Sequence, residues 1–221
     1  MKLLCSAIFK FLIGLLTVGT LIFLPAGTFE FLQGWLFIGL LFIPILVMWI
    51  ILYIKAPELL KKRLDGKEKE GTQKGVVVFS ALIFLAGFII SGIDFRFGWS
   101  YVPKIMTVIA SVLFLASYVL YAEVMRENAY LSRTVEVQKN QKVVDTGLYG
   151  IVRHPMYMTT IIMFLMIPLI LGSWFAFIIF LAYPIVIAVR IKNEEKILSE
   201  QLYGYIRYKQ KVKYRIIPFI W

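Results

Sequence analysis

Six runs of apolar residues constrain this chain more than any other feature of its sequence. A helix needs about 20 apolar residues to cross the hydrocarbon core of a bilayer, and in lipid every backbone N–H and C=O must pair within the segment. The runs therefore predict membrane-spanning α-helices rather than a soluble domain. They cover residues 3–24, 31–54, 75–93, 105–122, 156–172 and 174–189.

The last two runs are short, and only Gly172 and Ser173 separate them. They form either two full crossings or a tight helical hairpin. We therefore predict an all-α fold, a polytopic transmembrane helical bundle with five to six membrane segments, the last two a hairpin. A single domain is expected over residues 1–221, with N-terminal transmembrane helices in 1–125 and the functional half in 126–221.

Basic residues are concentrated in alternate connections between the runs. Residues 55–74 carry seven Lys or Arg, residues 126–153 carry five, and residues 190–221 carry eight, whereas the connections between them carry few. Cytoplasmic loops of membrane proteins are enriched in Lys and Arg. We therefore expect a multi-pass membrane protein whose N-terminus, C-terminus and functional site are cytoplasmic.

Composition limits the possible classes of function. The chain is 60% hydrophobic, so the formal net charge of +11 is better explained by loop charges that set topology than by a nucleic-acid partner. Cys5 is the single cysteine, which excludes a disulfide within the chain and a cysteine-based metal site. No cleavage site of a signal peptide follows the first run, and no metal site is predicted.

His154, the one histidine of the chain, directly precedes Pro155 at the start of the fifth run. Proline favours the first position of a helix, so His154 is expected to cap the helix that follows. The free N–H groups of that first turn then form a site for an anionic group, with Arg153 beside it. The alternative is that Arg153 and His154 only mark the membrane interface.

Arg190 and Glu194 are four residues apart near the inner end of the last run, so they share one face of a helix. An arginine at that depth commonly binds an anionic group, although an ordinary ion pair within the helix is the simpler interpretation. The tyrosines of residues 202–208 are expected to be interfacial anchors. No glycine-rich phosphate-binding motif is present, which argues against a soluble-type nucleotide fold.

Two separated motifs, in order, resemble a known family. The stretch VVDTGLYGIVRHPMY at residues 143–157 and the EExxL element at 194–198 are similar to the signature of isoprenylcysteine carboxyl methyltransferases. The GYxxY element at 204–208 and the terminal RIIPFIW at 215–221 extend this resemblance, which covers residues 127–221. The family belongs to a wider group of membrane methyltransferases that includes phospholipid N-methyltransferases.

The resemblance implies that the C-terminal half forms a cytosolic cap that binds S-adenosylmethionine. It also implies that the enzyme methylates a lipophilic or prenylated acceptor from the bilayer, with the carboxylate of an isoprenylcysteine-like lipid as the expected group. Arg190 and Glu194 are the implied catalytic residues, with Arg190 on the substrate side. The implied cofactor-binding residues are Gln138, Gln141, Lys142, Val143, Val144, Tyr149, His154, Pro155, Met156, Tyr157 and Glu194.

Three other functions remain open at this stage. The acceptor is alternatively an amine lipid, as in phospholipid N-methyltransferases. A sterol-type reductase that binds NADPH shares a related C-terminal half, although such reductases are usually longer. A small transporter is disfavoured because the apolar runs carry almost no ionisable residues.

Overall fold

The computed structural model describes residues 2–64, 71–131 and 137–221, and this part of the chain is helical with no strand. The prediction of an all-α bundle is thus confirmed. In chain order the elements are α1 (Lys2–Ala26), α2 (Leu32–Lys55), α3 (Pro57–Leu64), α4 (Gly71–Phe97), α5 (Lys104–Glu127), the 3-10 turn η1 (Gly147–Gly150), α6 (Pro155–Leu171), α7 (Trp174–Phe180), α8 (Tyr183–Gln201) and α9 (Tyr205–Lys211).

Five helical segments are long and apolar enough to cross a membrane. Four are single helices, whereas the fifth, Trp174–Gln201, joins α7 and α8. These two helices are separate because Pro184 lacks an N–H and interrupts the backbone hydrogen bonds near Leu181 and Ala182. The remaining apolar helix, α6, has 17 residues and is about 26 Å long at roughly 1.5 Å per residue.

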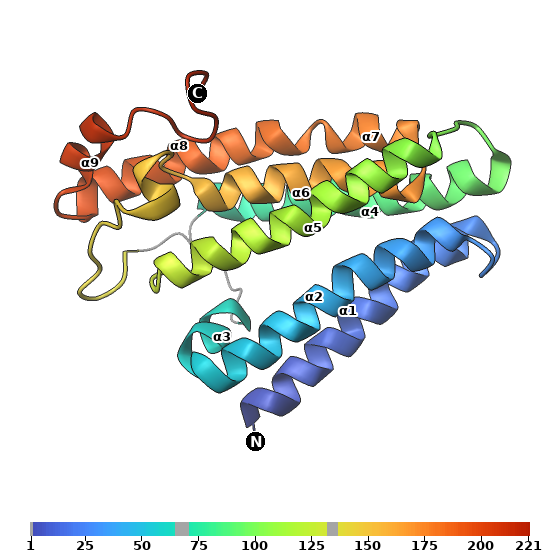
Figure 1. Ribbon diagram of the computed structural model, residues 1–221, viewed down its shortest axis with the longest axis horizontal. Coiled ribbons are helices and arrows are strands. Elements are labelled where there is room, and N and C mark those ends of the chain that lie inside the picture. The colour runs from blue at the N-terminus through green and yellow to red at the C-terminus, as the bar shows by residue number, and fades with distance from the viewer. Residues whose placement is uncertain (1, 65–70, 132–136) are drawn as a thin grey trace.

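The last two predicted runs do form an antiparallel hairpin, as Figure 1 shows for α6 and the α7–α8 segment. Gly172 ends α6 in a left-handed conformation (φ +80°), and the Ser173 side chain caps α7 by accepting a hydrogen bond from the N–H of Ala176 (3.1 Å). This two-residue connection places the start of α6 and the end of α8 at the same end of the bundle.

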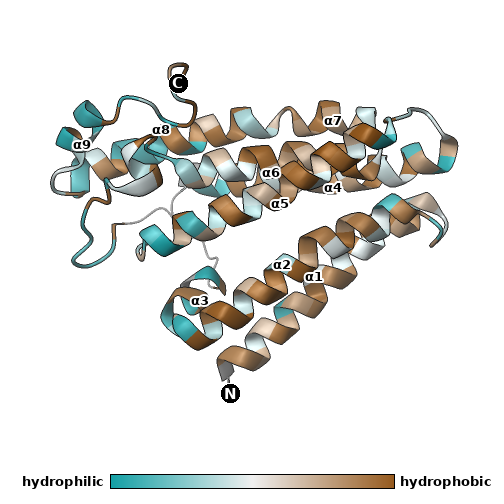
Figure 2. Ribbon diagram, viewed as in Figure 1, coloured by the Kyte–Doolittle hydropathy of each residue, from teal (hydrophilic) through white to brown (hydrophobic). Residues whose placement is uncertain are grey.

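Polar residues gather at that end, where α3 and α9 lie (Figure 2). The connections of the opposite end join α1 to α2, α4 to α5 and α6 to α7 (Figure 1). Both chain ends therefore lie toward the polar end. That this end faces the cytoplasm, and that the chain is one domain, stay predictions from the sequence.

A buried carboxylate links two of the three connections at the opposite end, those between α4 and α5 and between α6 and α7. Asp94 of α4 is 1% exposed and accepts hydrogen bonds from the Ser100 N–H (2.8 Å), the Ser100 hydroxyl (2.6 Å) and the Ser173 hydroxyl. Buried polar groups need such partners because they have lost their contacts with water. The contact fixes the turn of the hairpin relative to α4.

Small residues allow α4 to pack closely against its neighbours. A Cβ atom on Gly92 would lie 2.5 Å from the Ile22 carbonyl oxygen of α1, and one on Gly87 would lie 2.3 Å from the Phe180 ring of α7. Helix association in membranes relies on such close approach, because lipid tails provide no hydrophobic driving force between helices.

Gly92→Ala is expected to lower the free energy of unfolding by about 1–3 kcal/mol, because the new methyl group meets backbone atoms that cannot move aside. Gly75→Ala in the same helix is the matched control. A Cβ there meets no atom within 4 Å, so this change should be neutral or stabilising by up to about 1 kcal/mol. Thermal unfolding in detergent measures both, and equal stability of the two variants would contradict the proposed close packing.

Candidate functional site

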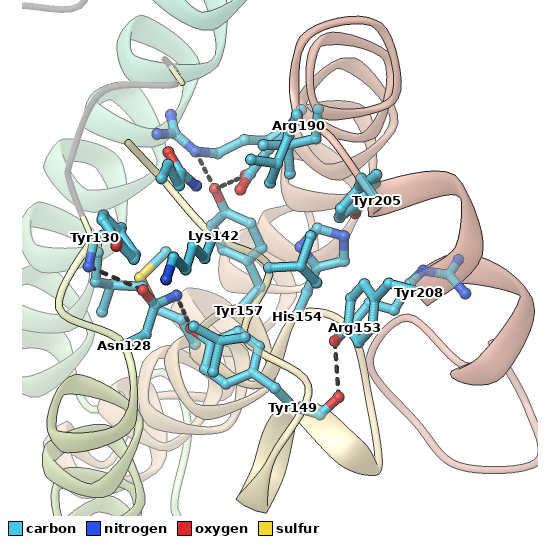
Figure 3. Close-up of a pocket in the computed structure, with 18 residues that line it drawn as sticks. Asn128, Tyr130, Lys142, Tyr149, Arg153, His154, Tyr157, Arg190, Tyr205 and Tyr208 are labelled. Carbon is cyan, nitrogen blue, oxygen red and sulfur yellow. Dashed lines mark hydrogen bonds between the residues drawn. The ribbon is translucent and has the colours of Figure 1, made fainter. Parts of the chain in front are cut away.

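A cavity opens at the polar end of the bundle, between the loop after α5, η1, the start of α6, α8 and α9 (Figure 3). Ten of the twelve residues predicted from the sequence line it. They are Gln141, Lys142, Val143, Val144, Tyr149, His154, Met156, Tyr157, Arg190 and Glu194. The segment before the hairpin and the segment after it therefore converge on one space, as the sequence predicted.

The other two predicted residues, Gln138 and Pro155, do not line the cavity. The Gln138 side chain donates a hydrogen bond to the Tyr130 carbonyl (2.5 Å), and its N–H donates to the Gln141 side chain (2.8 Å). Pro155 is the first residue of α6. Both residues lie next to lining residues, Gln138 by its hydrogen bond to Gln141 and Pro155 by its place before Met156.

Tyr149 of η1 connects the loop after α5 to α9 by hydrogen bonds. Its hydroxyl accepts a hydrogen bond from Asn128 (3.0 Å), while its carbonyl accepts one from the Tyr208 hydroxyl (2.7 Å). Burial raises the pKa of the Tyr149 hydroxyl above its usual range, so the group stays protonated. Neither Asn128 nor Tyr208 was predicted to belong to the site, and both line the cavity.

The 3-10 turn η1 requires a glycine at its first position. Gly147 has a φ of +52°, and a Cβ atom there would overlap the Glu127 carboxylate at 1.5 Å. That carboxylate accepts a hydrogen bond from the Leu148 N–H (3.0 Å) at the start of the turn. The glycine therefore lets an acid from the end of α5 cap η1.

His154 is the N-cap residue of α6, with Pro155 at its first position, as predicted. The N–H groups of Arg153 and His154 donate to the Tyr214 and Arg215 carbonyls of the C-terminal segment (2.9 and 2.8 Å). The Met156 N–H has no acceptor among the described residues. Met156 lines the cavity, and its N–H lies at the positive end of the helix dipole.

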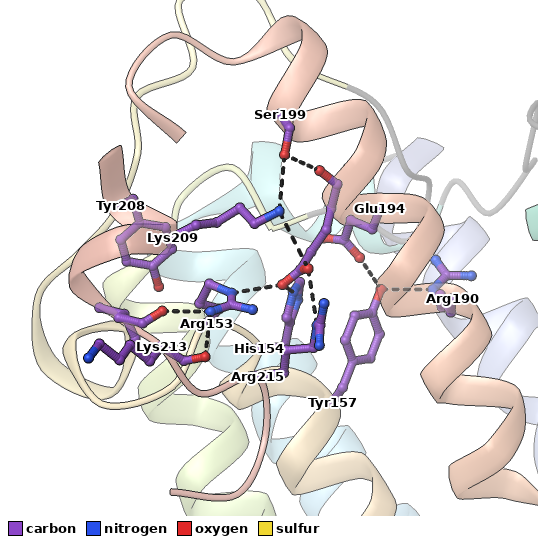
Figure 4. Close-up of polar contacts among 12 residues, drawn as sticks. Arg153, His154, Tyr157, Arg190, Glu194, Ser199, Tyr208, Lys209, Lys213 and Arg215 are labelled. Carbon is purple, nitrogen blue, oxygen red and sulfur yellow. Dashed lines mark hydrogen bonds and ion pairs between the residues drawn. The ribbon is translucent and has the colours of Figure 1, made fainter. Parts of the chain in front are cut away.

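The Arg153 charge is balanced by a buried carboxylate that sequence reasoning did not select (Figure 4). Glu195 is 3% exposed and accepts hydrogen bonds from Arg153 (2.7 Å) and Arg215 (3.0 Å), with the His154 ring at 3.3 Å. Arg153 also donates to the carbonyl oxygens of Val212 and Lys213. This Glu195 cluster clamps the C-terminal segment onto the start of α6.

Tyr157 connects the two residues predicted to be catalytic (Figure 4). Its hydroxyl donates to Glu194 Oε2 (2.5 Å) and accepts from Arg190 Nε (2.8 Å). The arginine and the carboxylate, one helical turn apart on α8, thus meet across a side chain of α6 on the wall of the cavity.

Two of the tyrosines expected to be interfacial anchors are buried. Tyr205 and Tyr208 are 4% and 5% exposed, whereas Tyr203 is 99% exposed. The anchor interpretation is therefore wrong for Tyr205 and Tyr208, which pack with Leu202 and Val212 and line the cavity. Their spacing on one face of α9 is the signal that distinguishes them from Tyr203.

The N-terminal half also reaches the cavity wall. Arg63 of α3 donates a hydrogen bond to the Tyr121 hydroxyl of α5 and lies 3.9 Å from the sulfur of Met156. No carboxylate of the described residues lies within ion-pair distance of Arg63. This contact could not be predicted from the sequence, because it depends on how α3 folds back against α5 and α6.

The fold and the site together define a polytopic helical membrane protein with a polar cavity at one end of its bundle. The family model for phospholipid methyltransferases matches residues 105–205. This segment runs from α5 to the first residue of α9 and contains all twelve predicted site residues. No curated protein matches the chain. The family match supports a membrane methyltransferase and does not distinguish the isoprenylcysteine branch from other branches.

Glu195→Gln is expected to destabilise the C-terminal segment, because it leaves Arg153 buried without a balancing charge. Loss of one partner of a buried ion pair costs about 3 kcal/mol or more, which should appear as a lower melting temperature and faster proteolysis after residue 201. Glu123→Gln is the control, since its pair with Arg126 is exposed and should matter little. Equal behaviour of the two variants would mean that the Glu195 cluster does not hold the segment.

Proposed function

We propose that this protein is an S-adenosylmethionine-dependent methyltransferase that modifies a lipid headgroup at the polar end of the bundle. The observation that carries the proposal is the Arg190–Tyr157–Glu194 chain on the wall of the cavity. The match to phospholipid methyltransferases supports the same class of reaction.

The residues of the cavity suit the chemical groups of such a donor. The Met156 N–H and the start of α6 suit its carboxylate, and the Glu194 carboxylate suits its positive charges. Val143, Val144 and Leu198 provide apolar surface for a purine ring. When bound, the donor supplies an electrophilic methyl group on a sulfonium centre.

The contribution of the protein is alignment, charge placement and exclusion of water. The Arg190 guanidinium holds an anionic acceptor group by charge-assisted hydrogen bonds, and the Tyr157 hydroxyl fixes the orientation of that guanidinium. A carboxylate acceptor is already nucleophilic, so its methylation requires no base.

The leading acceptor is the carboxylate of an isoprenylcysteine-like lipid, because Arg190 offers a cation beside the apolar hairpin. The second candidate is the amine of a phospholipid, which the family match favours. An amine has to lose a proton for the reaction, and Glu194 is the carboxylate placed on the cavity wall to accept it.

Incubation of purified protein in nanodiscs with a radiolabelled methyl donor tests the proposal. The acceptor panel contains prenylcysteines, isoprenoid acids and aminophospholipids, and the extracted lipids are counted and treated with base. Methyl esters are cleaved by base, whereas methylamines are not. Calorimetry with S-adenosylhomocysteine and NADPH accompanies the assay, and saturable binding of NADPH alone would favour a reductase instead.

Arg190→Ala and Glu194→Ala are each expected to reduce methyl transfer by about a hundredfold or more, because each removes a group that aligns the reactants. The expected acceptor distinguishes the two variants. If the acceptor is a carboxylate lipid, Arg190→Ala should raise the KM for the acceptor more than Glu194→Ala does. If the acceptor is an amine lipid, Glu194→Ala should lower kcat more than Arg190→Ala does. Lys192→Ala, an exposed change on the same helix, is the control. Full activity of either site variant removes that residue from the mechanism.

A further inference from the structure

The hydroxyl of Tyr205 is a buried polar group that no described residue satisfies. The side chain is 4% exposed and lines the cavity, and Figure 3 shows it beside His154, the N-cap of α6. The four other tyrosines that line the cavity have protein partners for their hydroxyls. These are Tyr130 with the Asn140 carbonyl, Tyr149 with Asn128, Tyr157 with Glu194 and Tyr208 with the Tyr149 carbonyl.

Packing alone does not account for the Tyr205 hydroxyl. The ring packs against Tyr208, at 5.7 Å between ring centroids, and against the apolar side chains of Leu202 and Val212. A phenylalanine would fill the same space without leaving a buried hydroxyl unpaired, which costs free energy in the absence of a ligand. An unpaired polar atom on a cavity wall therefore indicates a group supplied from outside the chain.

The protonation state of the Tyr205 hydroxyl indicates which kind of ligand group it binds. Burial and, to a smaller extent, the negative charges of Glu195 and Glu194 raise the pKa of the Tyr205 hydroxyl above its usual range. The hydroxyl therefore carries its proton and is available as a hydrogen-bond donor. The Met156 N–H, at the start of α6, is a second donor without an acceptor among the described residues.

We propose that the Tyr205 hydroxyl is a cofactor-binding group that donates a hydrogen bond to the carboxylate at the amino-acid end of the bound methyl donor. This inference rests on the proposed function. A carboxylate accepts hydrogen bonds and donates none, so it satisfies two donors at once, and it also lies favourably at the positive end of α6. The Glu195 cluster fastens the segment after α9 to this helix start, and Lys209 of α9 lies 3.8 Å from the same carboxylate.

Tyr205→Phe tests the inference because it removes only the hydroxyl. The probes for calorimetry on the full chain in detergent are S-adenosylhomocysteine and 5′-methylthioadenosine, which lacks the amino-acid end. We expect affinity for S-adenosylhomocysteine to fall about tenfold and affinity for 5′-methylthioadenosine to be unchanged. The melting temperature of the ligand-free variant should be equal to or higher than that of the wild type, because an unpaired buried hydroxyl is gone.

Tyr208→Phe is the matched variant, since its hydroxyl has a protein acceptor at 2.7 Å. It should lower the melting temperature and change the affinity for both probes by the same factor. Equal loss of both probes in Tyr205→Phe, or no loss of either, would overturn the inference while the proposed function stands. Failure of the wild-type protein to bind S-adenosylhomocysteine would instead reject the proposed function itself.

Discussion

The requirement that backbone groups pair inside each segment in lipid determines where this protein can do chemistry. It makes the spans helical and apolar, so the polar side chains collect where the helices end. The two-residue turn at Gly172 and Ser173 then returns the chain to the end from which α6 started. This turn explains how residues from two separated sequence blocks line one cavity.

Charge compensation divides the polar end into two parts with different roles. The Glu195 carboxylate contacts the side chains of Arg153, His154 and Arg215, and Arg153 also donates to two backbone carbonyls. These contacts hold the C-terminal segment in place. Around Tyr157, Arg190 and Glu194 are joined on the cavity wall. Neighbouring acids of one helix, about 100° apart around its axis, thus serve a structural cluster and a candidate reaction site.

Much of this arrangement was predictable from local sequence. Pro155 marks the start of α6 and Gly172 marks its end, and ten of the twelve site residues that the family resemblance implied line one cavity. The family resemblance selected Glu194, which lines the cavity, but the role of Glu195 was not predictable, because its burial depends on how Arg153, His154 and Arg215 pack around it. The burial of Tyr205 and Tyr208 depends on the packing of α9, so composition alone misplaced them at the membrane interface.

The contact of α3 with the cavity wall couples the N-terminal half of the chain to the C-terminal half. Arg63 lies outside the matched segment, yet its partners Tyr121 and Met156 lie inside it. The N-terminal helices are therefore more than a membrane anchor for the C-terminal half. A chimera that exchanged them between related proteins would have to carry both sides of this contact together to keep this part of the cavity wall.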